Sequence, residues 1–84
     1  FLGAHASVGG VTVVKDNVSI WSMSAVNKDL VIAEGTVVLA YSGVDKDTQP
    51  GQTYFGIPAV EVRKKWREIA TLKSLPDLIA KLDK

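Results

Sequence analysis

An aliphatic residue recurs at every sixth position over the first half of the chain, and this period restricts the fold more than any other feature. Starting at Leu2, eight successive sixth positions are all Leu, Ile or Val (Leu2, Val8, Val14, Ile20, Val26, Ile32, Val38 and Val44). An amphipathic helix repeats every ~3.6 residues and a half-buried strand every two, so neither produces this pattern. A six-residue unit instead predicts a short strand followed by a bend, with the aliphatic side chain turned inward.

The position four residues after each aliphatic supports the same interpretation. It is small or β-branched in all hexads but one (Ala6, Thr12, Val18, Ser24, Thr36, Ser42 and Thr48, with Leu30 as the exception). Three hexads would complete one triangular coil, and successive coils would stack through parallel strand pairing, so residues 1–55 should form about 2.7 coils of a β-shaft. Because a short stub with an open edge is poorly supported, we expect coils that continue upstream of residue 1, neighbouring subunits beside the shaft, or both.

The period changes after the turn signal Pro50-Gly51, and we expect residues 56–84 to form a helical extension. A first amphipathic helix is marked by apolar residues on one face (Val62, Trp66, Ile69 and Ala70). Ser74 is the expected N-cap of a second short helix, with Pro76 in its first turn.

Composition excludes several classes of protein. The chain has 84 residues, enough for one domain. It has no cysteine and a single histidine, so we expect neither disulfides nor a metal site. A net charge of +1 is too small for a nucleic-acid-binding face. No apolar run approaches the ~18–20 residues that span a bilayer, so we expect no transmembrane segment.

The repeat and the tail together resemble one family. The hexads resemble those of the hexapeptide-repeat acyltransferases. Three motifs then resemble the C-terminal end of the UDP-3-O-(3-hydroxyacyl)glucosamine N-acyltransferases of lipid A biosynthesis: Gly56-Ile57-Pro58-Ala59, Trp66-Arg67 and Leu75-Pro76-Asp77-Leu78. The resemblance implies a mainly β fold, a left-handed parallel β-helix with a short C-terminal α-helical tail, assembled as a homotrimer.

The same resemblance implies a function. It implies a cytoplasmic bacterial enzyme that transfers a 3-hydroxyacyl chain from acyl carrier protein to the amino group of a UDP-sugar, a UDP-glucosamine derivative. In such enzymes a histidine acts as general base on the attacking amine. No cofactor is implied beyond the acyl group carried by the carrier protein.

The catalytic histidine of the family is not matched in this chain. In the family it occupies the third place of a hexad that reads like I-A-H-N, and no such hexad is present. His5, at the fourth place of its hexad, is the one histidine to consider, and we expect it on a surface bend. Asp29 stands where a second family histidine would lie.

Five further residues match positions with roles in the family. Gly43 and Asp45 match places that line the acyl channel, although a glycine there could also simply ease a bend. In the family a basic surface contacts the acidic carrier protein, and three residues match it: Lys46, Lys65 and Arg67. Alternatively, these three residues are ordinary solvent-exposed charges.

Two further interpretations remain open. Three large apolar residues are expected to face outward: Trp21, Leu39 and Tyr41. They could form a subunit interface, line a ligand-binding site, or be ordinary surface residues. As a whole, the chain could be a non-catalytic trimerising β-helix fragment or paralogue. It could also belong to another hexapeptide acyl- or acetyltransferase, such as one that uses acetyl-CoA.

Overall fold

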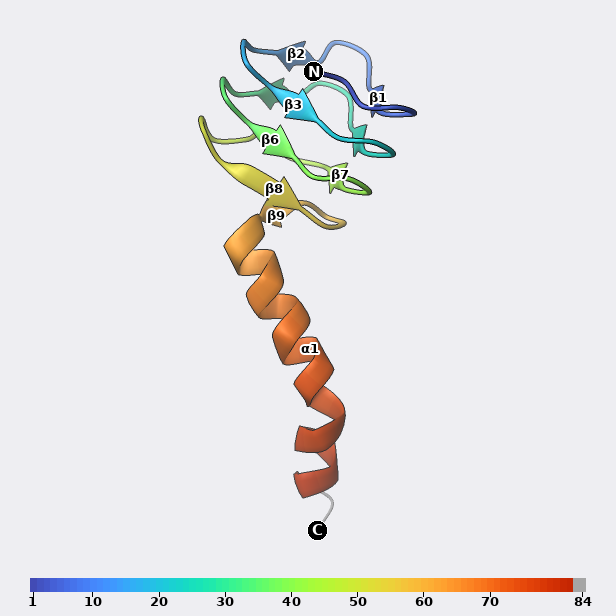
Figure 1. Cartoon of the computed structure of the whole chain (residues 1–84), viewed down its shortest axis with the longest axis vertical. Helices are drawn as coiled ribbons and strands as arrows, with labels where there is room; N and C mark the ends of the chain where they lie inside the picture. The colour runs from blue at the N-terminus through green and yellow to red at the C-terminus, as the bar shows by residue number, and fades with distance from the viewer. Residues whose placement is uncertain (83–84) are drawn as a thin grey trace.

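The computed structural model describes residues 1–82 and shows a β-shaft followed by one helix (Figure 1). Seven two-residue strands follow one another every six residues: β1 Ser7–Val8, β2 Val13–Val14, β3 Ser19–Ile20, β4 Ala25–Val26, β5 Val31–Ile32, β6 Val37–Val38 and β7 Gly43–Val44. The predicted mainly β fold with a C-terminal helical tail is confirmed.

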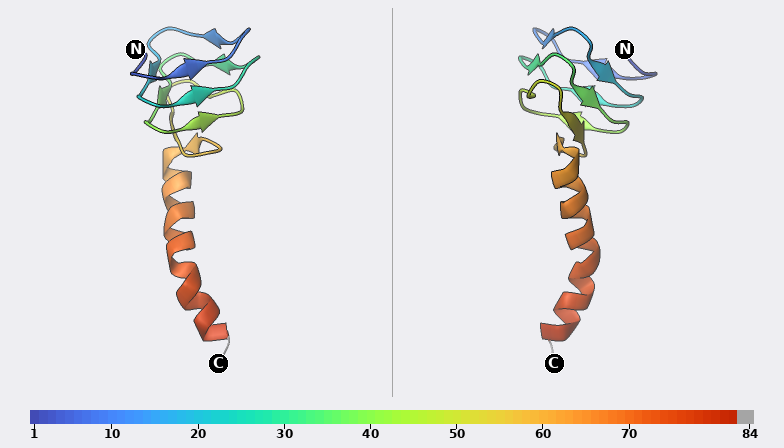
Figure 2. Two further views of the ribbon diagram at one scale, coloured as in Figure 1. Left: turned by 90° about the vertical axis from the view of Figure 1, so that its right-hand side faces the viewer. Right: turned by 60° about the vertical axis from the view of Figure 1, so that its left-hand side comes forward.

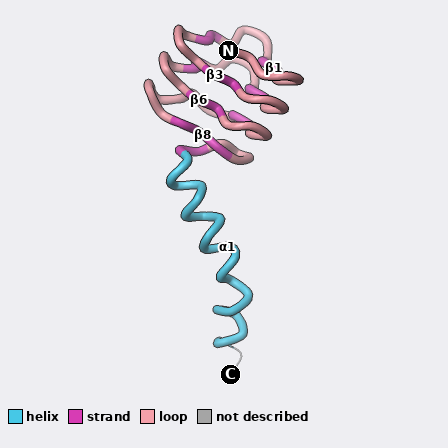
Figure 3. The backbone as a smooth tube through the Cα atoms, viewed as in Figure 1, coloured by secondary structure: helices cyan, strands magenta, loops and turns pink. Residues whose placement is uncertain are grey.

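The strands form three parallel ladders, which are the three faces of the shaft (Figure 3). Face A contains β3 and β6, face B contains β1, β4 and β7, and face C contains β2 and β5. The register advances by 18 residues at each step, so Ser7 pairs with Ala25 and Ala25 with Gly43. The chain therefore visits each face once per three hexads, as the six-residue period predicts.

A repeated backbone conformation makes the corners between faces. One residue per hexad has a positive φ near 60–70° (His5, Val11, Asn17, Met23, Asp29, Gly35 and Tyr41). This left-handed region turns the chain sharply, and it is unfavourable for residues other than Gly, Asn and Asp. The side chains at these corners point into solvent, which explains why residues as different as His5 and Tyr41 can occupy them.

The core is a stack of aliphatic side chains inside the shaft. Ile20, Val26, Ile32, Val38 and Val44 are at most 3% exposed, as predicted. The first three members of the series are more exposed: Leu2 61%, Val8 37% and Val14 44%. They pair in the same register as the buried residues one coil later, so they are exposed because no coil lies above them.

Small hydroxyl residues line the inside of the corners and are hydrogen-bonded there. The buried hydroxyls of Thr36 and Thr48 lie 2.9 Å apart, and Thr48 Oγ1 also accepts the Ala33 amide at 2.8 Å. Ser24 donates to the Leu39 carbonyl at 2.7 Å. No buried side-chain polar atom among the described residues lacks a partner. The small residues predicted at this place thus stabilise the bends as well as fitting them.

The last coil is shorter than the others and closes the lower end of the shaft. Strand β8 (Thr53–Phe55) joins face A, but it pairs with β6 in a 16-residue register, Val37 with Thr53. Face C gains no third strand, and Pro50, which has no amide to donate, lies in this stretch. Strand β9 (Val60–Glu61) then runs antiparallel to β8 and covers its free edge.

The tail is one helix, so the prediction of two helices divided at Ser74 was wrong. Helix α1 runs from Val62 to Leu82 with Pro76 in its interior. The Ser74 hydroxyl donates to the Thr71 carbonyl inside the helix instead of capping a new one. The helix begins where the Glu61 carboxylate accepts the Arg63 amide. Proline removes a single hydrogen bond, and the helix-favouring residues around it keep the chain helical.

No helix within residues 1–82 is long and apolar enough to cross a bilayer.

Candidate functional site

A groove of about 480 Å³ runs along face B beside the last coil. Two coils and the Gly-Ile-Pro-Ala segment line it: Ala25, Val26, Asn27, Gly43, Val44, Asp45, Ile57 and Pro58. Gly43 and Asp45, both predicted to line an acyl channel, therefore lie in one concave site.

The floor of the groove exists because the outward side chains of face B are small. Side chains alternate along a strand, so the first residue of each strand faces out and the second faces the core. The outward column reads Ser7, Ala25 and Gly43. This column leaves an open surface over which an extended apolar chain could lie.

Ile57 closes the lower end of this surface. A Cβ atom placed on Gly43 would lie 3.4 Å from both Cγ1 and Cγ2 of Ile57, which is ordinary van der Waals contact. The Ile57 side chain is itself 77% exposed, so the groove stays open to solvent at this end.

Backbone hydrogen bonds hold this end wall in place. The Gly43 amide donates to the Gly56 carbonyl at 2.9 Å, and the Ala59 amide donates to the Gly43 carbonyl at 2.8 Å. The Gly56 amide donates to Ser42 Oγ at 3.2 Å. Gly56 has a φ of 98°, which a glycine adopts without strain. The segment before β9 is therefore bound to the last coil on both sides of Ile57.

The rim of the groove is polar. Asn27 and Asp45 occupy the same place in successive coils, and the Asn27 amide donates to the Val44 carbonyl at 3.0 Å. The Asn27 side chain accepts the Lys28 amide at 2.8 Å, while the Asp45 carboxylate is exposed. The site thus combines an apolar floor with one amide and one carboxylate at its edge.

Neither residue related to the family's histidines lies in this groove. His5 is exposed at the corner between faces A and B, two coils from Gly43, a rise of roughly 10 Å. Asp29 is exposed at the corner between faces B and C, where its amide donates to the Gly10 carbonyl at 3.1 Å. Within residues 1–82, no three His, Cys, Asp or Glu side chains are grouped to hold a metal.

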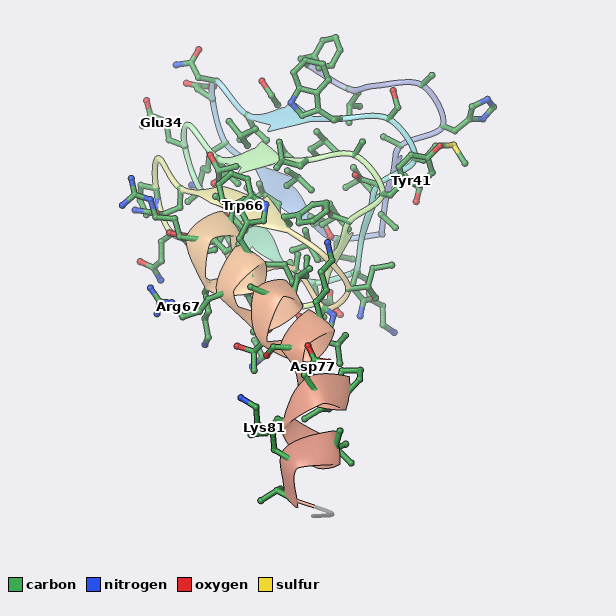
Figure 4. The ribbon with its side chains drawn as sticks, turned by 60° about the horizontal axis from the view of Figure 1, so that its bottom comes forward. Glu34, Tyr41, Trp66, Arg67, Asp77 and Lys81 are labelled. Atoms are coloured by element: carbon green, nitrogen blue, oxygen red, sulfur yellow. The ribbon has the colours of Figure 1, made fainter. Side chains whose placement is uncertain are left out.

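The three predicted basic residues do not form one surface. The side chain of Lys65 is 14% exposed and pairs with Glu68 at 3.3 Å. Its stem covers Gly56, where a Cβ would lie 2.5 Å from Lys65 Cε. Arg67 lies two positions later, roughly 200° around the helix, and extends into solvent (Figure 4). Lys46 is exposed on the last coil.

The predicted outward-facing apolar residues surround the corner between faces A and B. Trp21 is 46% exposed and packs against Phe1 with ring centroids 5.3 Å apart. Tyr41 is 68% exposed and projects away from the shaft (Figure 4), and Leu39 is half-buried.

Sequence reasoning missed four residues of the groove for two different reasons. Ala25 and Asn27 lie one coil, or 18 residues, before Gly43 and Asp45, so the repeat itself could have identified them. Ile57 and Pro58 reach the groove only because the chain reverses between β8 and β9. The hexad pattern has ended by then and gives no signal for that reversal.

Comparison with known proteins agrees with this architecture. No family model matches the chain. UDP-3-O-acylglucosamine N-acyltransferase of Methylobacterium sp. (strain 4-46) is 35% identical over 72 residues, which is 86% of this chain and 20% of the relative. The same enzyme from Methylobacterium nodulans is 33% identical over the same coverage. The predicted resemblance is confirmed. The chain spans about a fifth of the length of these relatives.

Solved structures show the same fold. GDP-perosamine N-acetyl transferase from Caulobacter crescentus superposes with a TM-score of 0.70 at 23% identity, over 71% of this chain and 29% of that protein. A hexapeptide-repeat acetyltransferase from Vibrio cholerae gives 0.59 at 32% identity, over 60% of this chain and 27% of that protein. The sequence relatives and these structural neighbours are all acyltransferases.

Proposed function

We propose that this chain is a segment of an acyl-carrier-protein-dependent N-acyltransferase of bacterial lipid A biosynthesis, acting in the cytoplasm. The enzyme would add a 3-hydroxyacyl chain to the amino group of a UDP-glucosamine derivative. The groove on face B is the observation that carries the proposal, because its small-residue floor and Ile57 end wall suit an extended acyl chain. Similarity to UDP-3-O-acylglucosamine N-acyltransferases supports the assignment of the reaction.

The proposed chemistry is a thioester aminolysis. The neutral amine attacks the thioester carbonyl, the C–N bond forms, the C–S bond breaks, and the thiol leaves on the carrier. A general base must take the proton from the amine. Because His5 lies two coils from the groove, we propose that residues outside these 84 supply this base. The proposal requires no cofactor.

The assembly and the carrier contacts belong to the same proposal. Residues 1–55 would be the shaft of a left-handed β-helix in a homotrimer, and residues 56–84 its helical extension. The rule that favours right-handed crossovers depends on strand twist, which two-residue strands scarcely develop. Lys46 and Arg67, both exposed, would contact the carrier protein. The predicted contact of Lys65 is not proposed again, because its side chain is 14% exposed and pairs with Glu68.

Titration of the chain with 3-hydroxyacyl-pantetheine thioesters, followed by NMR, tests the groove. We expect amide shifts at Gly43 and Asp45, and loss of binding in Gly43→Leu, whose side chain would fill the floor against Ile57. Gly10→Leu is the matched control, because a Cβ there meets nothing within 4 Å. Equal binding by both variants, or shifts confined to another face, would contradict the proposal.

A second candidate function is acetyl transfer from acetyl-CoA to a sugar. The structural neighbours favour it, since they are acetyltransferases and the Caulobacter crescentus complex contains CoA. The same titration with acetyl-CoA distinguishes the two. Preference for acetyl-CoA over the 3-hydroxyacyl thioesters would support the second candidate, and absence of binding to both would support a non-catalytic segment.

A further inference from the structure

Lys65 is the one lysine within residues 1–82 whose side chain is mostly buried. Its side chain is 14% exposed, whereas every other lysine of this range is exposed to solvent. Lysine side chains normally keep their charged end in water and are rarely buried. Lys65 belongs to the first turn of α1, which meets β8 and β9 at the lower end of the shaft (Figure 2).

The aliphatic stem of Lys65 makes a close contact with Gly56. A Cβ atom placed on Gly56 would lie 2.5 Å from Lys65 Cε, 2.8 Å from Cδ and 3.2 Å from Cγ, so the stem lies across the space that a side chain at residue 56 would need. Side chains of an α-helix point back toward its N-terminus, so a residue in the first turn of α1 reaches the segment before the helix. Gly56 begins the four-residue connection between β8 and β9, which also contains Ile57.

The charged end of Lys65 does not make this connection. Its Nζ lies 3.3 Å from Glu68 Oε1, and the Glu68 side chain is 46% exposed. Both partners belong to α1, so their ion pair joins no other element to the helix. Exposed pairs of this kind also contribute little to stability. The stem of Lys65 is therefore the part that links α1 to the β8–β9 connection.

Gly56 is held by the shaft on one side and by Lys65 on another. Its carbonyl accepts the Gly43 amide, and its amide donates to Ser42 Oγ. The direction in which a Cβ would extend is separate from both bonds and is covered by the Lys65 stem. Ile57, the next residue, is 77% exposed, so its own side chain has few contacts that could hold it. The position of Ile57 therefore depends on how firmly Gly56 is held.

We propose that Lys65 is a positioning residue for the groove. Its stem holds Gly56 against the last coil, and Ile57 is thereby kept against Gly43 as the end wall. Removing the stem would leave a gap beside a glycine, whose backbone is free to change conformation, and Ile57 would move away from the floor. That the groove takes an acyl chain rests on the proposed function, whereas the positioning of Ile57 by Lys65 does not.

Variants of the whole chain test the position of Ile57 without any ligand. In the wild type, Gly43 Hα and the Ile57 γ2-methyl group are close enough to give a nuclear Overhauser cross-peak. We expect this cross-peak to be lost in Lys65→Ala. It should be retained in Lys65→Met, which keeps an unbranched apolar side chain without the charge. Lys64→Ala is the matched control, because it removes the same groups from the neighbouring, exposed position.

The comparison of these variants decides between stem, charge and general loss of structure. Unchanged amide shifts at Ile32, in the buried core, will verify that the shaft is folded in each variant. A cross-peak that survives in Lys65→Ala, or that disappears equally in Lys64→Ala, would overturn the proposal. Its loss in Lys65→Met would also overturn it, because the charge and not the stem would then hold Ile57.

Binding of 3-hydroxyacyl-pantetheine thioesters of increasing chain length tests the consequence for the groove. In the wild type, a chain one or two methylenes longer than the best-fitting one should bind about tenfold more weakly, and in Lys65→Ala only about threefold or less. Lys65→Ala should have no further effect in an Ile57→Ala background, since the wall is then already removed.

The outcomes of the binding series separate the two proposals. The same length preference in the wild type and Lys65→Ala, or an equal effect of Lys65→Ala with and without Ile57, would contradict the positioning role. Failure of the wild type to bind any of these thioesters would instead refute the proposed function. The ligand-free cross-peak would still decide whether Lys65 positions Ile57.

Discussion

Val11 is a branched residue at a corner that requires the left-handed backbone region. Its φ is 60°, and its side chain is 86% exposed. For residues other than glycine this region costs roughly 1–2 kcal/mol, and a branched Cβ tolerates it poorly. Asn17 occupies the equivalent corner of the next hexad with the same φ. The same left-handed backbone conformation is therefore occupied by an unfavourable residue, Val11, and by a favourable one, Asn17.

Replacing Val11 with asparagine should stabilise the chain by about 1 kcal/mol. Almost no burial is lost, because the valine is already solvated. For a chain of this size, that gain corresponds to a rise in Tm of roughly 4–8 °C. Urea denaturation followed by circular dichroism should show a higher midpoint with an unchanged m-value.

Val13→Asn is the matched control. Val13 is 48% exposed in strand β2, where its backbone is extended. Asparagine is a poor strand residue, so this change should destabilise by up to ~1 kcal/mol. If Val11→Asn lowered the midpoint or left it unchanged, the strain assigned to the corner would be absent, and the reasoning would be wrong.

Three further predictions address the core, the coil spacing and the helix. Ile32→Asp should unfold the shaft, because residue 32 is fully buried and a lone carboxylate there has no partner; a cooperative melt at the original temperature would contradict this. Gly9→Ala should lower the denaturation midpoint, because its Cβ would lie 2.5 Å from the backbone of the next coil, whereas Gly10→Ala, in open space, should not. Pro76→Ala should slow hydrogen exchange in the last turns of α1, because it restores an amide that can donate to the Leu72 carbonyl; unchanged exchange would count against a continuous helix.

The shaft could be predicted from the sequence because one period controls both burial and turning. Ile32 and Val38 had to lie inside once the six-residue repeat was recognised, and both are fully buried. The exposure of Leu2 could not be inferred from the repeat, since it depends on what stacks above the first coil. The repeat determines whether a side chain points into the shaft, whereas its exposed fraction depends on whether another coil covers it.

The tail and the groove were less predictable for a related reason. Ser74 and Pro76 are typical of a helix start, but the same residues are tolerated inside a helix when strong helix formers surround them. Gly43 was predicted as a channel residue, yet the wall facing it depends on Ile57, fourteen residues later and beyond the last hexad. Tertiary contacts of this kind have no signature in the repeat.

The antiparallel strand β9 also limits how shafts could stack on one another end to end. Head-to-tail stacking of parallel coils would extend indefinitely, because each added copy would offer a fresh edge. Here the lower edge of face A is already paired with β9, and α1 follows immediately. Addition of a second shaft is therefore blocked at the end that carries β9 and α1, unless β9 first separates from β8.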